Sequence, residues 1–222
     1  MIFLGGCTPE AADETSATTK TDESTEVTPD EPEIVTAPVN YATPVDGEEV
    51  GVFETSEGRI VFVFYPDIAP EHVKRFKAMI KEGFYDGIRF HRCMRGFMIQ
   101  GGDPNSKDLS LAGRWGTGGY TDSSGREVNI DAEFNDMTHD RGVLSTARGP
   151  DTNSASSQFF IMHGDNTDLD GKYTAWGRVA EGIEVVDKII VASVVPDPRS
   201  GAVTPESAVV LTSARLDTWP LD

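Results

Sequence analysis

The stretch that says most about the fold is FHRCMRGFMIQGGD, residues 90–103. Two apolar segments lie on either side of Arg95 and Gly96, and the stretch ends on two glycines and an aspartate. Short apolar segments separated by glycine-containing turns are typical of strands in antiparallel sheets. We therefore expect residues 89–100 to form a pair of short strands.

The segments around this stretch predict further strands. Residues 59–65 (RIVFVFY) are rich in β-branched and aromatic residues, and the turn cluster 54–58 joins them to an apolar segment at 50–53. This pattern is typical of a β-hairpin. More strands are expected at 142–147, 158–163, 173–179 and 208–216.

Two segments have the spacing of an α-helix instead. Pro70 suits a first helical turn, apolar residues recur on one face, and Gly83 suits the end of the helix. We expect one helix from Pro70 to Glu82, a second from about Gly182 to Val191, and a long loop over residues 101–126. Many short strands with two helices, and no alternation of strand and helix, favour an antiparallel barrel or sandwich.

Charge divides the chain into two parts. The net charge is -18, and residues 8–46 contain ten acidic residues against one lysine, Lys20. A segment so polar cannot bury enough apolar surface to offset its ordering entropy. We expect a disordered acidic linker over residues 8–47 and a folded domain over 48–222. The excess of acid also argues against a nucleic-acid partner.

The two cysteines are not expected to form a disulfide. Cys7 precedes the linker, whereas Cys93 lies in an apolar stretch and is expected to be a small buried side chain. His91 lies near Cys93, but no further ligands follow at a useful spacing, so no metal site is expected.

The first seven residues, MIFLGGC, resemble the end of a bacterial lipoprotein signal. Under this interpretation residues 1–7 are a residual signal segment, Cys7 is a tentative site of lipid attachment, and the domain lies in the bacterial cell envelope. A basic first part and a longer apolar part are missing. If the likeness is accidental, a cytoplasmic location follows. No segment approaches the ~20 apolar residues that span a bilayer.

Four motifs follow one another in the predicted domain. They are FHR with GFMIQGGD (90–103), GTGG (116–119), GVLSTAR with SSQFFI (142–148 and 156–161), and LDGKY with Gly177 (169–177). In this order and spacing they closely resemble the cyclophilin family of peptidyl-prolyl cis/trans isomerases, from about Glu48 to Leu216. The resemblance implies an eight-stranded antiparallel β-barrel capped by two α-helices, with a groove on the outer face of the barrel. It also implies a protein-folding catalyst that acts on unfolded or proline-containing polypeptides, without a cofactor and as a monomer.

Such a reaction needs no covalent chemistry. Rotating a peptide bond breaks amide resonance, with a barrier of ~18–20 kcal/mol. As the bond twists, the proline nitrogen gains a lone pair, and a fixed hydrogen-bond donor there stabilises only the transition state. Arginine suits this task because it is permanently charged and presents several donors in a rigid fork.

The resemblance assigns a role to each of ten residues. Arg92 is the donor, Gln100 holds Arg92 and the substrate carbonyl side, and Phe97 completes the catalytic set. The expected substrate-binding residues are His91, Met98, Ala147, Arg148, Phe160, Leu169 and Tyr173. Phe97, Met98, Phe160 and Leu169 should grip the proline ring, whereas Phe159 should face the core. For His91 a structural role is the favoured alternative, since the mechanism needs no general base.

The sequence departs from well-known eukaryotic cyclophilins at two places. Asp168 stands where they carry a tryptophan, so we expect weak cyclosporin binding with catalysis retained. The loop 104–120 looks more like that of bacterial relatives.

Two other functions stay open at this point. One is a binding or chaperone module without turnover, which a substitution at Arg92 would separate from an enzyme. The other is a hydrolase using Ser156 or Ser157 with His163 and Asp165, although no nucleophile elbow is visible.

Overall fold

The computed structural model describes residues 42–221, all of them in the second of two units of the chain, Ile34–Asp222. The expectations for the lipoprotein-like start, for Cys7 and for most of the acidic linker lie outside the described residues. Between residues 42 and 221, no helix is long and apolar enough to cross a membrane.

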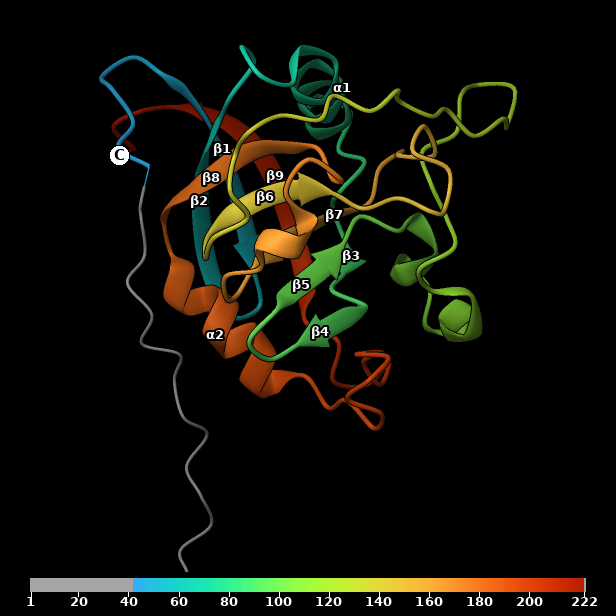
Figure 1. Ribbon diagram of the computed structural model, residues 1–222. Helices are drawn as coiled ribbons and strands as arrows, with labels where there is room; N and C mark the ends of the chain where they lie inside the picture. The colour runs from blue at the N-terminus through green and yellow to red at the C-terminus, as the bar shows by residue number, and fades with distance from the viewer. Residues whose placement is uncertain (1–41, 222) are drawn as a thin grey trace, which may run out of the picture. The chain divides into compact units, whose positions relative to one another are not determined.

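The described part is built on one curled antiparallel sheet (Figure 1). Its nine strands have the order β3-β9-β1-β2-β8-β6-β7-β5-β4. The strands are β1 (Glu49–Thr55), β2 (Gly58–Phe64), β3 (Ile88–Arg89), β4 (Arg92–Met94), β5 (Met98–Gly101), β6 (Val143–Thr146), β7 (Phe159–Met162), β8 (Ala175–Glu181) and β9 (Val210–Thr218). The mainly β, antiparallel fold class is confirmed. The resemblance implied eight strands, and the sheet has nine, of which β3 and β4 are only two and three residues long.

Two α-helices lie toward opposite ends of this sheet (Figure 1). Helix α1 (Pro70–Lys81) begins with its proline in the first turn, and Glu82 caps its end. Helix α2 (Ile183–Ala192) follows Gly182, whose φ of 85° is left-handed. Both predicted helices are confirmed to within a residue at each end.

The segment expected to be a long loop contains two short 3-10 helices. They are η1 (Pro104–Lys107) and η2 (Leu109–Arg114), and each starts after an aspartate that caps it. The fully buried Asp103 accepts the Asn105 N–H at 2.8 Å and the Gly116 N–H at 2.5 Å. One buried carboxylate therefore joins both ends of this segment. A third 3-10 helix, η3 (Thr167–Leu169), follows β7.

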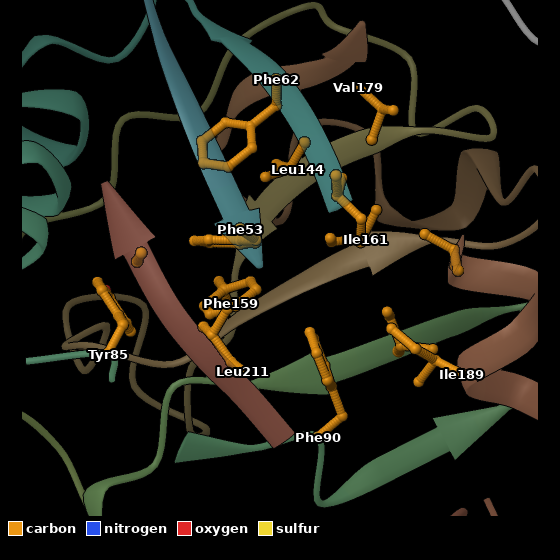
Figure 2. Packing of buried hydrophobic residues seen from close by; sticks show 14 of the residues in the cluster. Phe53, Phe62, Tyr85, Phe90, Leu144, Phe159, Ile161, Val179, Ile189 and Leu211 are labelled. Carbon is orange, nitrogen blue, oxygen red and sulfur yellow. The ribbon is translucent and has the colours of Figure 1, made fainter. Parts of the chain in front are cut away.

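The main core is aromatic and lies on the inner face of the sheet. Figure 2 shows Phe53, Phe62 and Phe159 converging there, and the ring centroids of Phe53 and Phe62 are 4.7 Å apart. Phe159 belongs to this cluster, whereas Phe160 belongs to a second cluster on the other face of β7. The expected inward direction of Phe159 is confirmed. Cys93 is also buried, as predicted, and its thiol is free.

Residues just before β1 are bonded to the sheet. The Ala42 N–H donates to the Val179 carbonyl at 3.1 Å, and the Gly47 N–H donates to the Trp219 carbonyl at 2.8 Å. This part of the expected linker, residues 42–47, thus contacts the folded domain that was expected to begin at residue 48.

Candidate active site

A cavity of about 110 Å³ opens on the outer side of β4, β5 and β7, beside the residues that follow β6. We call it the first cavity. It is lined by Arg92, Phe97, Met98, Gln100, Ala147, Arg148, Phe160, Leu169 and Tyr173. The structure therefore brings together nine of the ten residues predicted for the site, from five separate segments of the chain, and His91 is the one that does not line it.

Strand register sets the central row of this cavity. Arg92 of β4 pairs with Gln100 of β5, and Gln100 pairs with Phe160 of β7. Residues paired across strands in this way project from the same face of a sheet. An arginine, an amide and a phenyl ring consequently lie side by side across three strands.

Three contacts hold the half-buried Arg92 side chain. Its Nε donates to the Ser200 carbonyl at 2.8 Å, its Nη1 to Gln100 Oε1 at 3.3 Å, and its Nη2 lies 3.0 Å from Met94 Sδ. A guanidinium has five N–H groups. Two of them therefore have no partner among residues 42–221 and remain for a ligand. Burial lowers the pKa of Arg92 from its usual value, but an arginine keeps its charge in proteins.

A glutamine relay orients the amide that faces Arg92. Gln100 Nε2 donates to Gln158 Oε1 at 2.9 Å, and Gln158 Nε2 donates to the Gly118 carbonyl at 2.8 Å. A carbonyl can only accept, so Gly118 fixes the direction of both amides. Gln100 is thereby left with its oxygen, and not its NH₂, toward the guanidinium.

The walls of the first cavity are apolar. Met98 and Phe160 are buried, and Phe97, Leu169 and Tyr173 pack against them. The rings of Phe160 and Tyr173 meet edge to face with centroids 5.8 Å apart. Such a cavity suits a small apolar ring with no polar group to satisfy.

The Arg148 side chain lies along this wall. Its guanidinium is 4.7 Å from the Tyr173 ring centroid, and its Nη2 donates to the Lys172 carbonyl at 2.9 Å. A cation over an aromatic face is stabilising. The side chain therefore adds a positive charge to the rim of the cavity.

His91 lies beneath the site. It is 6% exposed, and burial is the main reason why its pKa is lowered to about 4, with Asp103 opposing the shift. Its imidazole is therefore neutral at pH 7 and packs below Gly116, whose added Cβ would lie 3.6 Å from the ring. This placement agrees with the structural alternative for His91.

A second cavity of about 280 Å³ adjoins the first. The two share Gln100, Ala147 and Arg148, and the second continues toward Glu127 and Gln158. The two cavities are therefore continuous along Gln100, Ala147 and Arg148.

Sequence reasoning missed two contributors to the site. Gln158 lies within the motif SSQFFI and two residues from Phe160, the spacing that puts strand residues on one face, but no role is predicted for it from the sequence. The Ser200 carbonyl could not have been found, because a main-chain acceptor 108 residues away from Arg92 leaves no signal in the sequence.

The hydrolase alternative finds no support in the geometry. Ser156 and Ser157 donate to main-chain carbonyls, and within residues 42–221 no hydrogen bond joins His163 to either serine. A different set does come together, since His139 lies 2.9 Å from Asp170 and 3.1 Å from Ser145. Ser145 is completely buried, so no substrate can reach its hydroxyl.

A curled antiparallel sheet with an apolar cavity on its outer face, and an arginine held rigidly at the rim, defines the cyclophilin class of proteins. Residues 51–215 match the model of the family described as cyclophilin type peptidyl-prolyl cis-trans isomerase. The chain belongs to this family and is a peptidyl-prolyl cis-trans isomerase, an enzyme that rotates Xaa-Pro bonds in protein substrates.

Named relatives agree with this assignment. The chain is 36% identical over 185 residues to a probable peptidyl-prolyl cis-trans isomerase of Brucella abortus, covering 81% of this chain and 89% of the relative. It is 37% identical over 153 residues to peptidyl-prolyl cis-trans isomerase B of Bacillus subtilis, covering 68% of this chain and 97% of the relative.

Solved structures give the same result for the fold. A cyclophilin type isomerase of Cryptosporidium parvum, crystallised in the presence of the dipeptide Ala-Pro, has a TM-score of 0.63 at 27% identity, covering 76% of this chain and 99% of that one. A cyclophilin from Hirschia baltica has a TM-score of 0.61 at 28% identity, covering 80% of this chain and 78% of that one.

Proposed function

We propose that Arg92 is the catalytic donor of this isomerase and that Gln100 and Phe97 complete the catalytic set. The observation that carries the proposal is the position of Arg92, held by three contacts at the rim of the apolar first cavity with two N–H groups unused. With the proline ring against Phe160, its nitrogen would lie on the Arg92 side of the cavity. A donor there stabilises the lone pair that appears only when the amide twists.

The remaining residues of the first cavity bind the substrate. Met98, Phe160, Leu169 and Tyr173 exclude water from the proline ring, and Ala147 with Arg148 borders both cavities, where an extended main chain would pair. No proton is transferred in this mechanism, so a general base is not needed. This agrees with the buried, neutral state of His91.

The natural substrates are unfolded or proline-containing polypeptides of the bacterial cell envelope, bound by a monomeric enzyme that is anchored through an acylated Cys7. The lipoprotein-like start and the acidic spacer after it support this part of the proposal. A Cys7→Ser variant should move from the membrane fraction to the soluble fraction of the native host. A wild-type protein that lacks an acyl mass on Cys7 would end the anchoring proposal without affecting the enzyme.

The catalytic proposal is tested by exchange NMR on an Ala-Pro peptide with the wild type and Arg92→Ala side by side. A preorganised donor is worth ~3–4 kcal/mol, so the variant should lose a factor of roughly 10²–10³ in catalysed exchange. Peptide affinity should change far less, because the pocket stays intact.

Arg126→Ala is the matched control, since it removes an exposed arginine whose side chain, among residues 42–221, pairs only with Asp122. The role of Arg92 is rejected if both variants exchange the peptide as fast as the wild type. A wild type that binds the peptide without accelerating exchange would instead leave a proline-binding module.

A further inference from the structure

The β-turn of residues 94–97 carries Phe97 into the first cavity, and we call it the Gly96 turn. The Phe97 N–H closes it by donating to the Met94 carbonyl at 3.0 Å. Gly96 has a φ of 75°, a left-handed conformation that favours glycine. The turn is exposed on one side, so its position depends on what lies against its other side.

That other side is the segment directly after β7. The His163 N–H donates to the Phe97 carbonyl at 2.9 Å, and the Gly164 N–H reaches the same carbonyl at 3.3 Å. The Gly96 N–H donates in return to His163 Nδ1 at 2.8 Å. Of these three bonds, only the last one depends on a side chain.

The backbones of the two segments are in close contact. A Cβ added to Gly164 would lie 2.5 Å from the Gly96 carbonyl oxygen, closer than real Cβ contacts come. The backbone of the turn therefore rests directly on Gly164. A small displacement of the His163 ring would be transmitted to Gly96 and on to Phe97.

Asp187 of α2 lies against the ring from its far side. His163 Nε2 lies 3.3 Å from Asp187 Oδ1, and both oxygens of Asp187 accept from Arg141 Nη2 at 2.7 and 2.8 Å. Arg141 Nη1 also donates to the His163 carbonyl at 2.6 Å. The buried His163 and Arg141 and the partly exposed Asp187 therefore form one unit.

Hydrogen counting assigns the tautomer of the ring. Nδ1 accepts the Gly96 N–H, so it carries no hydrogen of its own. A neutral ring then carries its hydrogen on Nε2, which lies 3.3 Å from the negatively charged Asp187 Oδ1, and this charge favours a hydrogen at that position. Exchanging the two protonation sites would place donors against Gly96 and lone pairs against Asp187.

Burial, together with two neighbouring arginines, keeps the ring neutral. Burial is the main cause that lowers the pKa of His163 to about 4, Arg141 and Arg95 lower it further, and Asp187 opposes them. The acceptor at Nδ1 is therefore present throughout the range of pH 5 to 8.

We propose that His163 is a positioning residue of the isomerase: held by Asp187 as the Nε2–H tautomer, it accepts the Gly96 N–H and so sets the place of Phe97 in the first cavity. It touches no substrate. The kinetic effect expected of His163 rests on the isomerase activity. The hydrogen bond from the Gly96 amide can be measured independently of that activity.

Two variants of similar polarity separate this role from plain structural support. In His163→Asn the amide oxygen can replace Nδ1 as acceptor for Gly96, whereas in His163→Gln the amide reaches the position of Nε2 and leaves Gly96 without an acceptor. We expect His163→Gln to lose at least tenfold in Gly96 amide protection and several-fold in kcat/KM, while His163→Asn retains most of both.

Denaturant unfolding of both variants supplies the control. If their kcat/KM values fall in proportion to lost stability, with no difference at the Gly96 amide, His163 is structural and the proposal is overturned. Catalysed exchange on the Ala-Pro peptide measures the kinetic part. Should the Arg92 proposal fail, the Gly96 amide still reports on His163 independently.

A measurement on the wild type keeps the test valid if a variant does not fold. The ¹⁵N shifts of the His163 imidazole should show a protonated Nε2 and an unprotonated Nδ1, unchanged between pH 5.5 and 8. A ring with the hydrogen on Nδ1, or one that titrates near pH 6.5, would overturn the proposal.

Discussion

Replacing Gln158 by methionine should slow catalysis although Gln158 does not line the first cavity. The side chain accepts from Gln100 Nε2 at 2.9 Å and donates to the Gly118 carbonyl at 2.8 Å. Methionine has nearly the same length but can do neither. The Gln100 amide is then free to turn over and present its NH₂ group to the Arg92 guanidinium.

The expected magnitude follows from the hydrogen bonds lost. Each of the two bonds is worth about 1 kcal/mol net. If this energy holds Arg92 in place for the transition state, the barrier should rise by about 1–2 kcal/mol, a loss of roughly 5- to 30-fold in kcat/KM. Gln158→Glu keeps the acceptor toward Gln100, so its loss should be smaller.

Exchange NMR on the Ala-Pro peptide gives the rates, and denaturant unfolding of each variant gives the matching stability. The relay is refuted if Gln158→Met isomerises like the wild type. It is equally refuted if Gln158→Glu proves as slow as Gln158→Met, because loss of the acceptor would then not be the cause.

Three further predictions concern pH, the buried thiol and the departure at Asp168. In each of the protein's four histidines burial lowers the pKa, to about 4 for His91 and His163. The unfolded chain binds these protons near pH 6.5, so the free energy of unfolding should fall as pH drops from 6.5 to 4. At pH 4.5 the loss should be about 2–3 kcal/mol for each of His91 and His163. Equal unfolding midpoints at pH 7 and 4.5 would contradict this. Burial raises the pKa of Cys93 to about 11, and only the thiolate reacts with thiol reagents. In a Cys7→Ser background, such a reagent at pH 8 should therefore label the folded protein at least roughly a hundredfold more slowly than the unfolded one. Asp168 is exposed in η3 beside Leu169, and we expect cyclosporin inhibition to be weak in the wild type and tighter in Asp168→Trp, with sub-micromolar inhibition of the wild type as the contrary result.

Sequence patterns predicted the elements well where local chemistry decides them. Pro70 and the apolar face after it gave the bounds of α1, and the alternation of Phe159 with Phe160 gave their opposite directions, since successive strand residues face opposite sides. These signals lie within a few residues of what they determine.

The candidate site was predictable to a different degree. The nine lining residues came from the family resemblance, because the pairing of Arg92, Gln100 and Phe160 depends on a strand order that periodicity alone does not reveal. The contacts that orient Arg92, at Gln158 and at the Ser200 carbonyl, are long-range and partly main-chain. The stacking of Arg148 on Tyr173 was likewise hidden, since either side chain could have pointed to solvent.

The contact between Gly164 and Gly96 has a consequence for reading genetic screens of this enzyme. Every side chain larger than hydrogen at position 164 would push on the turn that carries Phe97. A saturation library selected for activity should therefore be depleted at this codon almost as strongly as at Arg92, although no atom of Gly164 belongs to the cavity. Intolerance to substitution at Gly164 would reflect the close contact between two backbone segments. A binding surface inferred from such data would then wrongly include Gly164.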